Sequence, residues 1–288
     1  MHNLKEYLDN ARQSKNAIGH FNISNIETLW AIFDAARALD QPVVIGVSEG
    51  ERNFIGVRQA ASLVQSLRHE FGYPIFINAD HTHDFEGVKK AIDIGFDSVM
   101  IDGSQLLFDE NVALTKKCVE YARQIQKKEG RTILVEAELG YIGTSSTILD
   151  AIPDGAGADM TPPDVADRFV EMTDVDIFAP SVGNIHGIVT SGNPHIDVKR
   201  VQDIAAQTTC HLVLHGGSGI SDADIRAGVH AGISIVHVNT EIRVAFREGL
   251  EKGLKEDSTV APYKYMDKAR KSVYDVVYKK IQLFANFS

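Results

Sequence analysis

Three histidines stand out because each follows a short apolar run and precedes small or polar residues. They are His81 in PIFINADHTHD, His186 in DIFAPSVGNIHG and His215 in HLVLHGGSG. In a barrel of parallel strands such positions gather at the C-terminal rim, where barrel enzymes hold their chemistry. Three neutral imidazoles around an open position make a catalytic divalent-metal site, typically a zinc site. One histidine at a strand end is more often structural, but its recurrence in three units predicts a metal centre.

Carboxylates accompany these histidines. Asp80 directly precedes His81, and adjacent residues of a strand point in different directions, so one can bind metal while the other faces substrate. A turn or helix-capping role is the alternative for Asp80. Asp102 in SVMIDGS and Glu138 in LVEAELG end two further strands, where they could orient the histidines or hold an alternative metal position. Glu136, two residues before Glu138, is expected to be structural, and His83, two residues after His81, is expected to be a surface residue.

The sequence HGGSG at 215–219 is typical of a phosphate-binding turn. Gly216 and its neighbouring glycines allow a close backbone approach, Ser218 adds a hydroxyl, and the following helix directs its positive N-terminal dipole at an anion. The next unit, VHVNTEIR, presents Asn239 and Thr240 where a strand passes into a helix. In (β/α)8 barrels the loops after the last two strands often form the phosphate site. Together the two segments predict a site for a phosphorylated ligand.

The elements that must position these residues alternate along the chain. Apolar runs predict strands at 17–23, 42–47, 74–79, 98–101, 132–139, 176–182, 211–215 and 234–238. Segments of helical periodicity follow at 26–40, 56–71, 84–95, 110–128, 162–173, 197–207, 222–232 and 241–254. Strands without polar alternation, each followed by an amphipathic helix, indicate a parallel sheet covered by helices. Eight such units predict an α/β fold with one (β/α)8 TIM barrel over 1–288. A doubly wound open sheet would carry a glycine-rich nucleotide turn after its first strand, which this chain lacks.

Two segments fall outside this repeat. Residues 140–160 are too long for an ordinary βα turn and are rich in Gly, Ser, Thr and Asp, which predicts a mobile active-site loop; a surface insertion is the alternative. Residues 263–284 predict an additional C-terminal helix that packs on the barrel or on another subunit. Ser24, with Glu27 three residues later, indicates a capping box, and Ser221 indicates a helix N-cap.

The composition restricts the class of partner. The formal net charge is −10 and the charges are spread along the chain, which argues against nonspecific binding to nucleic acid or to a membrane surface. No apolar run approaches the ~20 residues that span a bilayer. Cys118 and Cys210 are isolated and are predicted to be buried free thiols, which favours a reducing cytoplasm.

Six motifs follow one another from the third predicted strand to the eighth. They are ADH, MIDGS, VEAELG, GNIHG, LVLHGGSGI and NTEIR. Their order resembles the class II, metal-dependent ketose-bisphosphate aldolases, the family of the fructose- and tagatose-bisphosphate aldolases, and the resemblance extends from AIGHFNISNIETL to the final helix. It implies a lyase of carbohydrate metabolism and glycolysis that reversibly cleaves a ketose 1,6-bisphosphate to dihydroxyacetone phosphate and glyceraldehyde 3-phosphate. It also implies a homodimer or homotetramer.

The resemblance implies a role for each matched residue. Asp80 matches the catalytic acid and base. The Zn²⁺ ligands are matched by His81, His186 and His215, and the carboxylates of a second or exchangeable metal position by Asp102 and Glu138. The remaining residues at family site positions are expected to bind the phosphorylated sugar or a monovalent cation, Na⁺ or K⁺: Asn22, Ser48, Gly187, Gly216, Ser218, His237, Asn239 and Thr240. Of these, Asn22 and Ser48 resemble residues that line the aldehyde half of the substrate site.

The chain departs from the pattern of this family in four places. His237 stands where an asparagine usually contacts the ketone half of the substrate, and Asn239 stands where Ala or Asp is common. YIGTSS replaces the Gly-Gly and acidic residues that usually follow ELG, so the glutamate for proton transfer at the ketone half has no clear equivalent. HGIVTSG lacks the usual aromatic–Lys pair. These differences keep another phosphorylated ketose or keto-acid open as the substrate.

Two other functional classes are the remaining alternatives. A catalytically silent sugar-phosphate-binding protein could use the same barrel, but Asp80 beside three ligand-like histidines argues against it. A divalent-metal sugar isomerase is the second, although its metal sites are usually built mainly from carboxylates. No lysine occupies a predicted strand end, which favours a metal-assisted route over an imine route.

Overall fold

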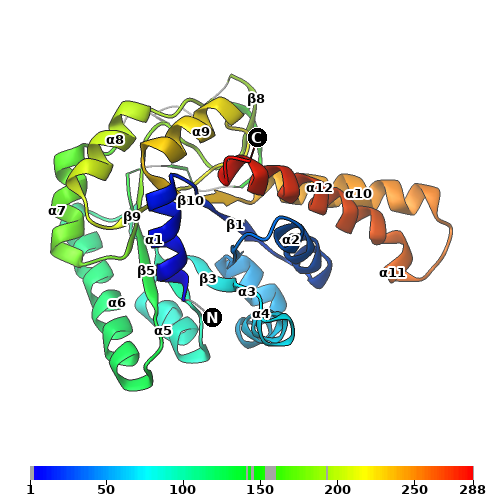
Figure 1. The fold of residues 1–288 in the computed structure, drawn as a ribbon, viewed down its shortest axis with the longest axis horizontal. Helices are drawn as coiled ribbons and strands as arrows, with labels where there is room; N and C mark the ends of the chain where they lie inside the picture. The colour runs from blue at the N-terminus through cyan, green and yellow to red at the C-terminus, as the bar shows by residue number, and fades with distance from the viewer. Residues whose placement is uncertain (1–2, 141, 144–145, 153–159, 193, 288) are drawn as a thin grey trace.

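The computed structural model describes residues 3–140, 142–143, 146–152, 160–192 and 194–287. Eight parallel strands close into a barrel in the order β1-β10-β9-β7-β5-β4-β3-β2 (Figure 1). They are β1 (Ile18–Asn22), β2 (Val43–Val47), β3 (Ile75–Thr82), β4 (Ser98–Ile101), β5 (Leu134–Leu139), β7 (Ile177–Pro180), β9 (His211–Leu214) and β10 (Ile233–Val238). All eight fall within or beside the strands predicted from the sequence, and the (β/α)8 barrel is confirmed.

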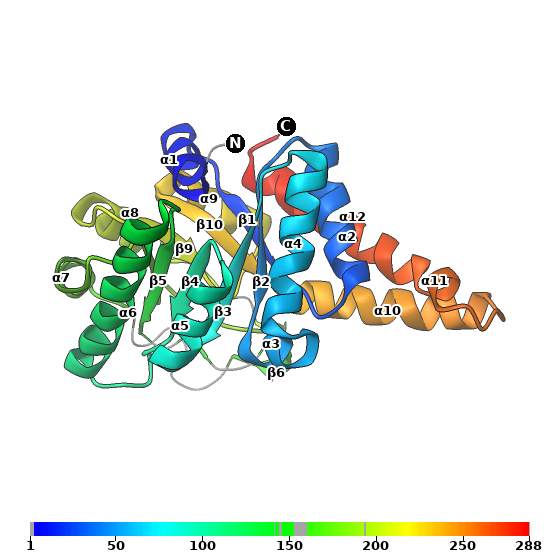
Figure 2. The same ribbon diagram turned by 90° about the horizontal axis from the view of Figure 1, so that it is seen from below.

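Helices cover the outside of the barrel (Figures 1 and 2). Those of the repeat are α2 (Ile26–Ala38), α4 (Val57–Phe71), α5 (Phe85–Ile94), α6 (Phe108–Glu129), α7 (Pro163–Thr173), α8 (Val198–Gln207), α9 (Asp222–Ala231) and α10 (Thr240–Glu256). Four more are α1 (Leu4–Ser14), α3 (Glu49–Ile55), α11 (Pro262–Tyr265) and α12 (Asp267–Phe284). In the described ranges, no helix combines the length and apolarity that a membrane crossing needs.

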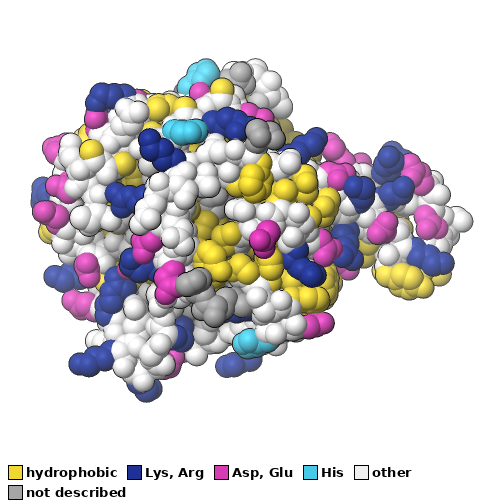
Figure 3. Space-filling model, in the orientation of Figure 1, with side chains coloured by type: hydrophobic (Ala, Val, Ile, Leu, Met, Phe, Trp, Pro, Cys, Tyr) yellow, Lys and Arg dark blue, Asp and Glu magenta, His cyan; other side chains and the backbone are white. Residues whose placement is uncertain are grey.

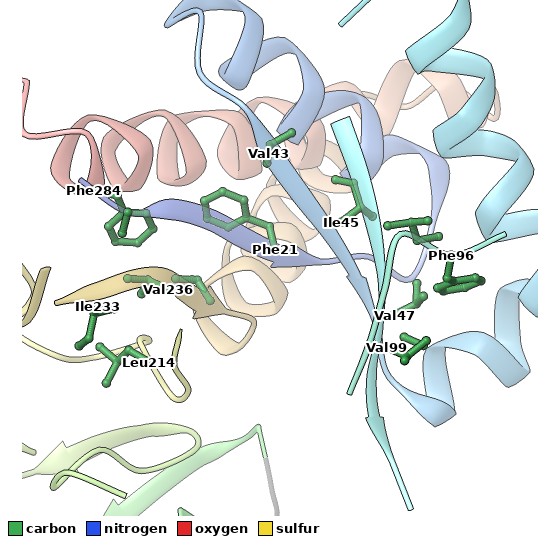
Figure 4. Close-up of a cluster of buried hydrophobic side chains, with 14 of the residues drawn as sticks. Phe21, Val43, Ile45, Val47, Phe96, Val99, Leu214, Ile233, Val236 and Phe284 are labelled. Atoms are coloured by element: carbon green, nitrogen blue, oxygen red, sulfur yellow. The ribbon is translucent and has the colours of Figure 1, made fainter. Parts of the chain in front are cut away.

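The main hydrophobic core lies between the strands and the surrounding helices. Figure 4 shows Ile45 and Phe96 within it, and both side chains are fully buried. The predicted additional C-terminal helix, α12, packs on the barrel of its own chain, where Phe284 stacks on Phe21 of β1 with 6.3 Å between ring centroids. The far ends of α10 and α12 project with α11 as an arm (Figures 1 and 2).

A second buried cluster fills the N-terminal end of the barrel. Here α1 places Leu4 and Leu8 against the lowest inward-facing side chains of the strands, which are Ile18, Val44, Phe76, Leu134, Ile177, Ala179, Val213 and Ile235. Successive side chains of a strand alternate between its two faces, so the next inward positions lie two residues further on. Those positions are largely polar and buried: His20, Asn78, Glu136, His215 and His237. The barrel interior is therefore apolar at one end and polar at the other.

Several local predictions need correction. Asn25, rather than Ser24, caps α2, because its side chain accepts from the backbone N–H of Thr28. The predicted loop 140–160 contains β6 (Ile148–Ala151), which pairs in parallel with β8 (Ile188–Ser191). Residues 141, 144–145 and 153–159 of this loop lie outside the described part of the chain, so the mobility of the loop stays a prediction. The short helix α3 was not predicted, whereas Ser221 caps α9 as expected.

The surface and the cysteines agree with the composition. Positive and negative side chains are interspersed over the face of the molecule in Figure 3. Both cysteines, Cys118 and Cys210, are buried free thiols as predicted.

Candidate active site

The three predicted metal ligands meet at the polar end of the barrel. His81 lies in β3, His215 directly follows β9, and His186 lies between β7 and β8. The ring centroid of His81 is 4.9 Å from that of His186 and 5.0 Å from that of His215, while the latter two are 5.6 Å apart. One nitrogen of each ring and one carboxylate oxygen of Glu138 lie within 4.8 Å of one another. The imidazoles therefore surround a common centre.

The donor atoms of this cluster fit a divalent cation. In the described part of the chain, His186 Nε2, His215 Nδ1 and Glu138 Oε2 are buried and have no hydrogen-bond partner. Leaving a buried polar atom unpaired costs about 1–3 kcal/mol, and a cation bound among these atoms would remove that penalty. Imidazole nitrogens with a carboxylate oxygen are a donor set that zinc accepts in proteins.

Carboxylates behind the rings fix which nitrogen faces the centre. Asp102 Oδ2 lies 2.8 Å from His81 Nδ1, and Asp102 Oδ1 accepts from the backbone and hydroxyl of Ser104. Glu136 Oε1 lies 2.6 Å from His215 Nε2. Such partners orient metal-bound imidazoles and raise their basicity. Of the two uses that the sequence left open for Asp102, its geometry suits the orienting one, and Glu136 has the same relation to His215.

Burial and neighbouring charges set the protonation of the rings. Burial alone would lower the pKa of His81, but the carboxylates of Asp80, Asp102 and Glu138 raise that pKa to about 10. Burial and the charge of His81 lower the pKa of His215 to about 3. His81 therefore holds a proton when no cation is bound. Because a metal ligand must be deprotonated, cation binding displaces this proton.

Asp80 presents one free carboxylate oxygen beside the histidines. Its side chain is 4% exposed, and Oδ2 accepts from Asn22 Nδ2 at 2.9 Å. Oδ1 has no hydrogen-bond partner among the described residues. Burial would raise the pKa of Asp80, but the charge of His81 and a contact with His237 hold it well below its usual value. The capping role considered for this residue belongs to Asp84, whose side chain accepts from the first turn of α5.

The glycine-rich turn forms a cradle next to this carboxylate. Gly216 has a φ of +62°, and a Cβ added there would lie 2.1 Å from the carbonyl oxygen of Ile185. Only glycine fits this backbone position. Asn239, at the start of α10, makes no side-chain cap, and the hydroxyl of Ser218 accepts from the backbone N–H of Glu241 in the first turn of α10.

Two adjacent chambers lie beside the histidine cluster and Asp80. The inner chamber holds about 310 Å³ and is lined by the glycine-rich turn and the start of α10. The outer chamber holds about 890 Å³, part of it open to solvent, and is lined by α3 and by the residues after β4. Both chambers share Asp80, His81, Ser146, His186 and Asn239. An elongated ligand that occupies both chambers must therefore cross the metal cluster and Asp80.

Comparison with known proteins identifies the family. The profile described as "Fructose-bisphosphate aldolase class-II" matches residues 2–287. The chain belongs to this family. The "Fructose-bisphosphate aldolase" of Staphylococcus epidermidis is 38% identical over 286 residues, which cover 98% of this chain and 96% of the relative. That of Geobacillus stearothermophilus is 36% identical over 287 residues with the same coverage. The crystal structure of the YdjI aldolase from Escherichia coli K12 is 28% identical, with a TM-score of 0.81 over 98% of this chain and 96% of that one.

Membership in the class II aldolase family makes this chain a carbon–carbon lyase of a family that generally depends on metal. The cluster of three imidazoles with Glu138 is a group of donors that could hold such an ion. All the residues predicted to bind substrate line one of the two chambers of this aldolase: Asn22, Ser48, Gly187, Gly216, Ser218, His237, Asn239 and Thr240. His83 lines the outer chamber with an exposed ring, as expected for a surface residue.

Three residues near the site were missed in the sequence. Glu51 forms a capping box with Ser48, and the S-x-x-E pattern could have revealed it. Arg243 follows Thr240 by one helical turn and reaches the outer chamber, which no motif indicated. His20 precedes Asn22 by two residues, so strand periodicity alone places both side chains inside the barrel.

The buried ring of His20 should make stability depend on pH. Burial, with a contribution from His237, lowers the pKa of His20 to about 3. The folded chain therefore keeps this ring neutral at pH values where an unfolded histidine, with a pKa near 6.5, binds a proton. The unfolded state then holds the extra proton, so the free energy of unfolding decreases as the pH falls from about 6.5 toward 3. The slope for one such group is about 1.4 kcal/mol per pH unit.

Replacement of this ring gives the measurement. In urea unfolding at a series of pH values between about 7 and 4, His20→Leu should lose stability less steeply below pH 6.5 than the unmodified chain. Parallel curves for the two proteins would show that His20 is not kept neutral by folding.

Proposed function

We propose that this aldolase reversibly cleaves a ketose 1,6-bisphosphate of the fructose or tagatose type to dihydroxyacetone phosphate and glyceraldehyde 3-phosphate. The supporting observation is the position of Asp80, whose free oxygen lies beside the three imidazoles where the two chambers meet. Cleavage of a ketose requires a base at the hydroxyl of C4 and an electrophile at the carbonyl of C2. This junction offers the base and the donors for a metal electrophile.

The metal ion that suits the site is Zn²⁺, held by His81, His186 and His215. Glu138, in the same ligand group, provides the alternative metal position, and Asp102 holds the ring of His81. A divalent cation at this place would polarise the ketone as a Lewis acid, an effect worth several kcal/mol in the transition state. We also assign the Na⁺ or K⁺ position to the glycine-rich turn, near Gly187 and Ser218, whose backbone and hydroxyl oxygens are the usual ligands of such ions.

We assign the ketone half of the sugar to the inner chamber. Its phosphate would lie against the glycine-rich turn and the start of α10, with Ser218, Asn239 and Thr240 around it. The N-terminal dipole of α10 favours a phosphate there without a lysine. The aldehyde half then extends past Asn22 and Ser48 into the outer chamber.

Asp80 carries out the proton transfer. Its Oδ1 accepts the proton of the C4 hydroxyl as the C3–C4 bond breaks, and the C4 oxygen becomes the carbonyl oxygen of the aldehyde. The electron pair of the broken bond stays on the ketone half as an enediolate, which takes up one proton at C3 to give dihydroxyacetone phosphate. In the condensation direction the same proton returns to that oxygen. Asn22 holds the other carboxylate oxygen and so fixes the direction of attack. No lysine lies among the described residues that line either chamber, which favours this route over an imine.

The charge of the outer chamber supports a second candidate substrate. Arg243 is its one basic residue apart from histidine among the described lining residues, while Glu49, Asp80 and Asp102 are acidic. Arg243 is also paired with Glu51 at 2.8 Å. If the ketose has a phosphate only at C1, the part of the sugar in this acidic chamber carries neutral hydroxyls and no second phosphate. A sugar isomerase or a silent binding protein has no such support.

We further propose that the chain is a single domain that acts in the cytoplasm as a homodimer or homotetramer in glycolysis, with a mobile loop at 140–160. Buried free thiols suit a reducing compartment. Exposed apolar side chains on the projecting arm, Leu254, Val260 and Tyr263, suit contact with another subunit.

A substrate panel with a chelator tests the proposed reaction. The purified protein should cleave fructose or tagatose 1,6-bisphosphate and release a triose phosphate, EDTA should abolish the activity, and Zn²⁺ should restore it. Borohydride added with substrate should leave the activity unchanged. A covalent adduct trapped by borohydride, or the absence of cleavage in the zinc-loaded protein, would contradict the proposal.

Removal of the carboxylate tests the role of Asp80. Asp80→Ala should lower kcat by roughly 10²- to 10⁴-fold, the usual contribution of a general base, while bound zinc stays stoichiometric. Asp80→Asn keeps the shape and the contact site of Asn22 but cannot accept the proton, and it should be impaired to a similar extent. Near-normal turnover in either variant would refute the assignment.

Removal of the guanidinium tests whether the second phosphate binds in the outer chamber. Arg243→Gln should lower kcat/KM for the bisphosphate roughly 10- to 100-fold, because a hydrogen bond to a charged group contributes ~1.5–3 kcal/mol. The corresponding ketose 1-phosphate should be cleaved at an unchanged rate. Arg247→Gln, one helical turn further along the arm, is the matched control. Equal losses for both substrates would show that Arg243 does not recognise the distal phosphate.

A further inference from the structure

Two histidines lie face to face beneath the proposed base. His20 of β1 and His237 of β10 are directly opposite each other in the parallel strand pair. Their ring centroids are 3.4 Å apart and their planes differ by 6°. Both rings are buried, with 1% and 6% exposed. Because the two strands form one rigid part of the barrel wall, this stack is held from both sides by the backbone.

His20 is held by packing alone. In the described residues, neither of its ring nitrogens has a hydrogen-bond partner. A Cβ added to Gly46 would lie 2.1 Å from His20 Cε1 and 2.8 Å from Asn22 Oδ1, so the ring fills its space against β2. A polar ring that makes no hydrogen bond contributes through its shape, and here the shape fixes the plane of His237.

His237 stands between the base and the metal cluster. Its Nδ1 is 3.5 Å from Asp80 Oδ1, and its Nε2 is 3.8 Å from Glu136 Oε2. Its ring lies 4.2 Å from that of His215 at an angle of 34°. The two oxygens of Asp80 thus face two different groups, Asn22 on one side and His237 on the other. A contact of 3.5 Å is long for a hydrogen bond, but catalytic hydrogen bonds often shorten when substrate binds.

We propose that His237 is a positioning residue that directs Asp80 Oδ1 at the C4 hydroxyl, and that His20 positions His237 by stacking. The inference rests on the proposed aldol cleavage. At position 237, where the family usually has an asparagine, this chain has an imidazole that is stacked on His20. The position of a reacting group matters, because a displacement of about 1 Å lowers rates by up to ~100-fold. His237 therefore acts on the rate of bond cleavage through Asp80.

Substitutions at position 237 separate the polar contact from the ring. His237→Leu removes the Nδ1 donor and should lower kcat roughly 10- to 100-fold with little change in KM for the bisphosphate. His237→Asn restores an N–H donor near the Nδ1 position and should recover most of this loss. Bound zinc, measured by metal analysis, and the thermal unfolding temperature should match the unmodified protein in both variants. If folded, zinc-loaded His237→Leu keeps its kcat, or if Asn rescues nothing, the positioning role is wrong.

The stacking is tested by combining the two sites. His20→Leu should lower kcat by about tenfold, but the double variant with His237→Leu should be no slower than His237→Leu alone, because His20 acts only through its partner. Losses that multiply would overturn that link.

A partial reaction separates Asp80 from the rest of the site. Exchange of the carbon-bound hydrogen of dihydroxyacetone phosphate with solvent does not involve the C4 oxygen, so it should continue at its normal rate in His20→Leu, whose altered side chain lines neither chamber. An equal loss of exchange and cleavage would show general damage and contradict the proposal. Absence of both reactions in the unmodified protein would instead refute the proposed function.

Discussion

The alternation of side chains along the barrel strands is the constraint on which the site depends. On β5, Leu134 belongs to the second buried cluster, at the N-terminal end of the barrel, and is followed on the same face by Glu136 and Glu138. On β3, Phe76 has the same relation to Asp80. A period of two residues thus makes these two strands into columns that are apolar at their start and reactive at their end, although His81 departs from the period with a φ of +38°. Closure of the sheet brings these columns together, and a shift of one residue in any strand would turn its reactive groups outward.

This arrangement concentrates polar groups where water is scarce, so each must be held by a neighbour. Buried charged groups are stable only when they are paired or bound to a cation. Asp102 and Glu136 pair with the outer nitrogens of His81 and His215, and among the described residues His215 Nδ1 has no hydrogen-bond partner. A metal ion would pair such buried atoms, so its binding should stabilise the folded chain. In Asp80, Oδ2 accepts from Asn22, and Oδ1 has no hydrogen-bond partner among the described residues.

The sequence predicted the parts of this design that depend on local pattern. Strands, repeat helices, the three histidines and the glycine-rich turn each carry a periodicity or spacing that a single segment reveals. Pairings between distant segments were not predicted, since no local pattern encodes them: β6 with β8, and His20 with His237. Arg243 was missed for a related reason, because its relevance comes from the direction of α10 into the chamber. The choice of Asn25 over Ser24 as helix cap shows that two adjacent capping residues cannot be ranked by type alone.

The proposed chemistry depends on one cation being bound by imidazoles from β3, from the residue after β9 and from the connection between β7 and β8. X-ray absorption at the zinc edge of the zinc-loaded protein tests it most directly, since the fine structure distinguishes imidazole from carboxylate or water. We expect a single bound zinc whose scattering contains three imidazoles, those of His81, His186 and His215. A shell of oxygen ligands without imidazole, or a protein that retains no zinc, would contradict it.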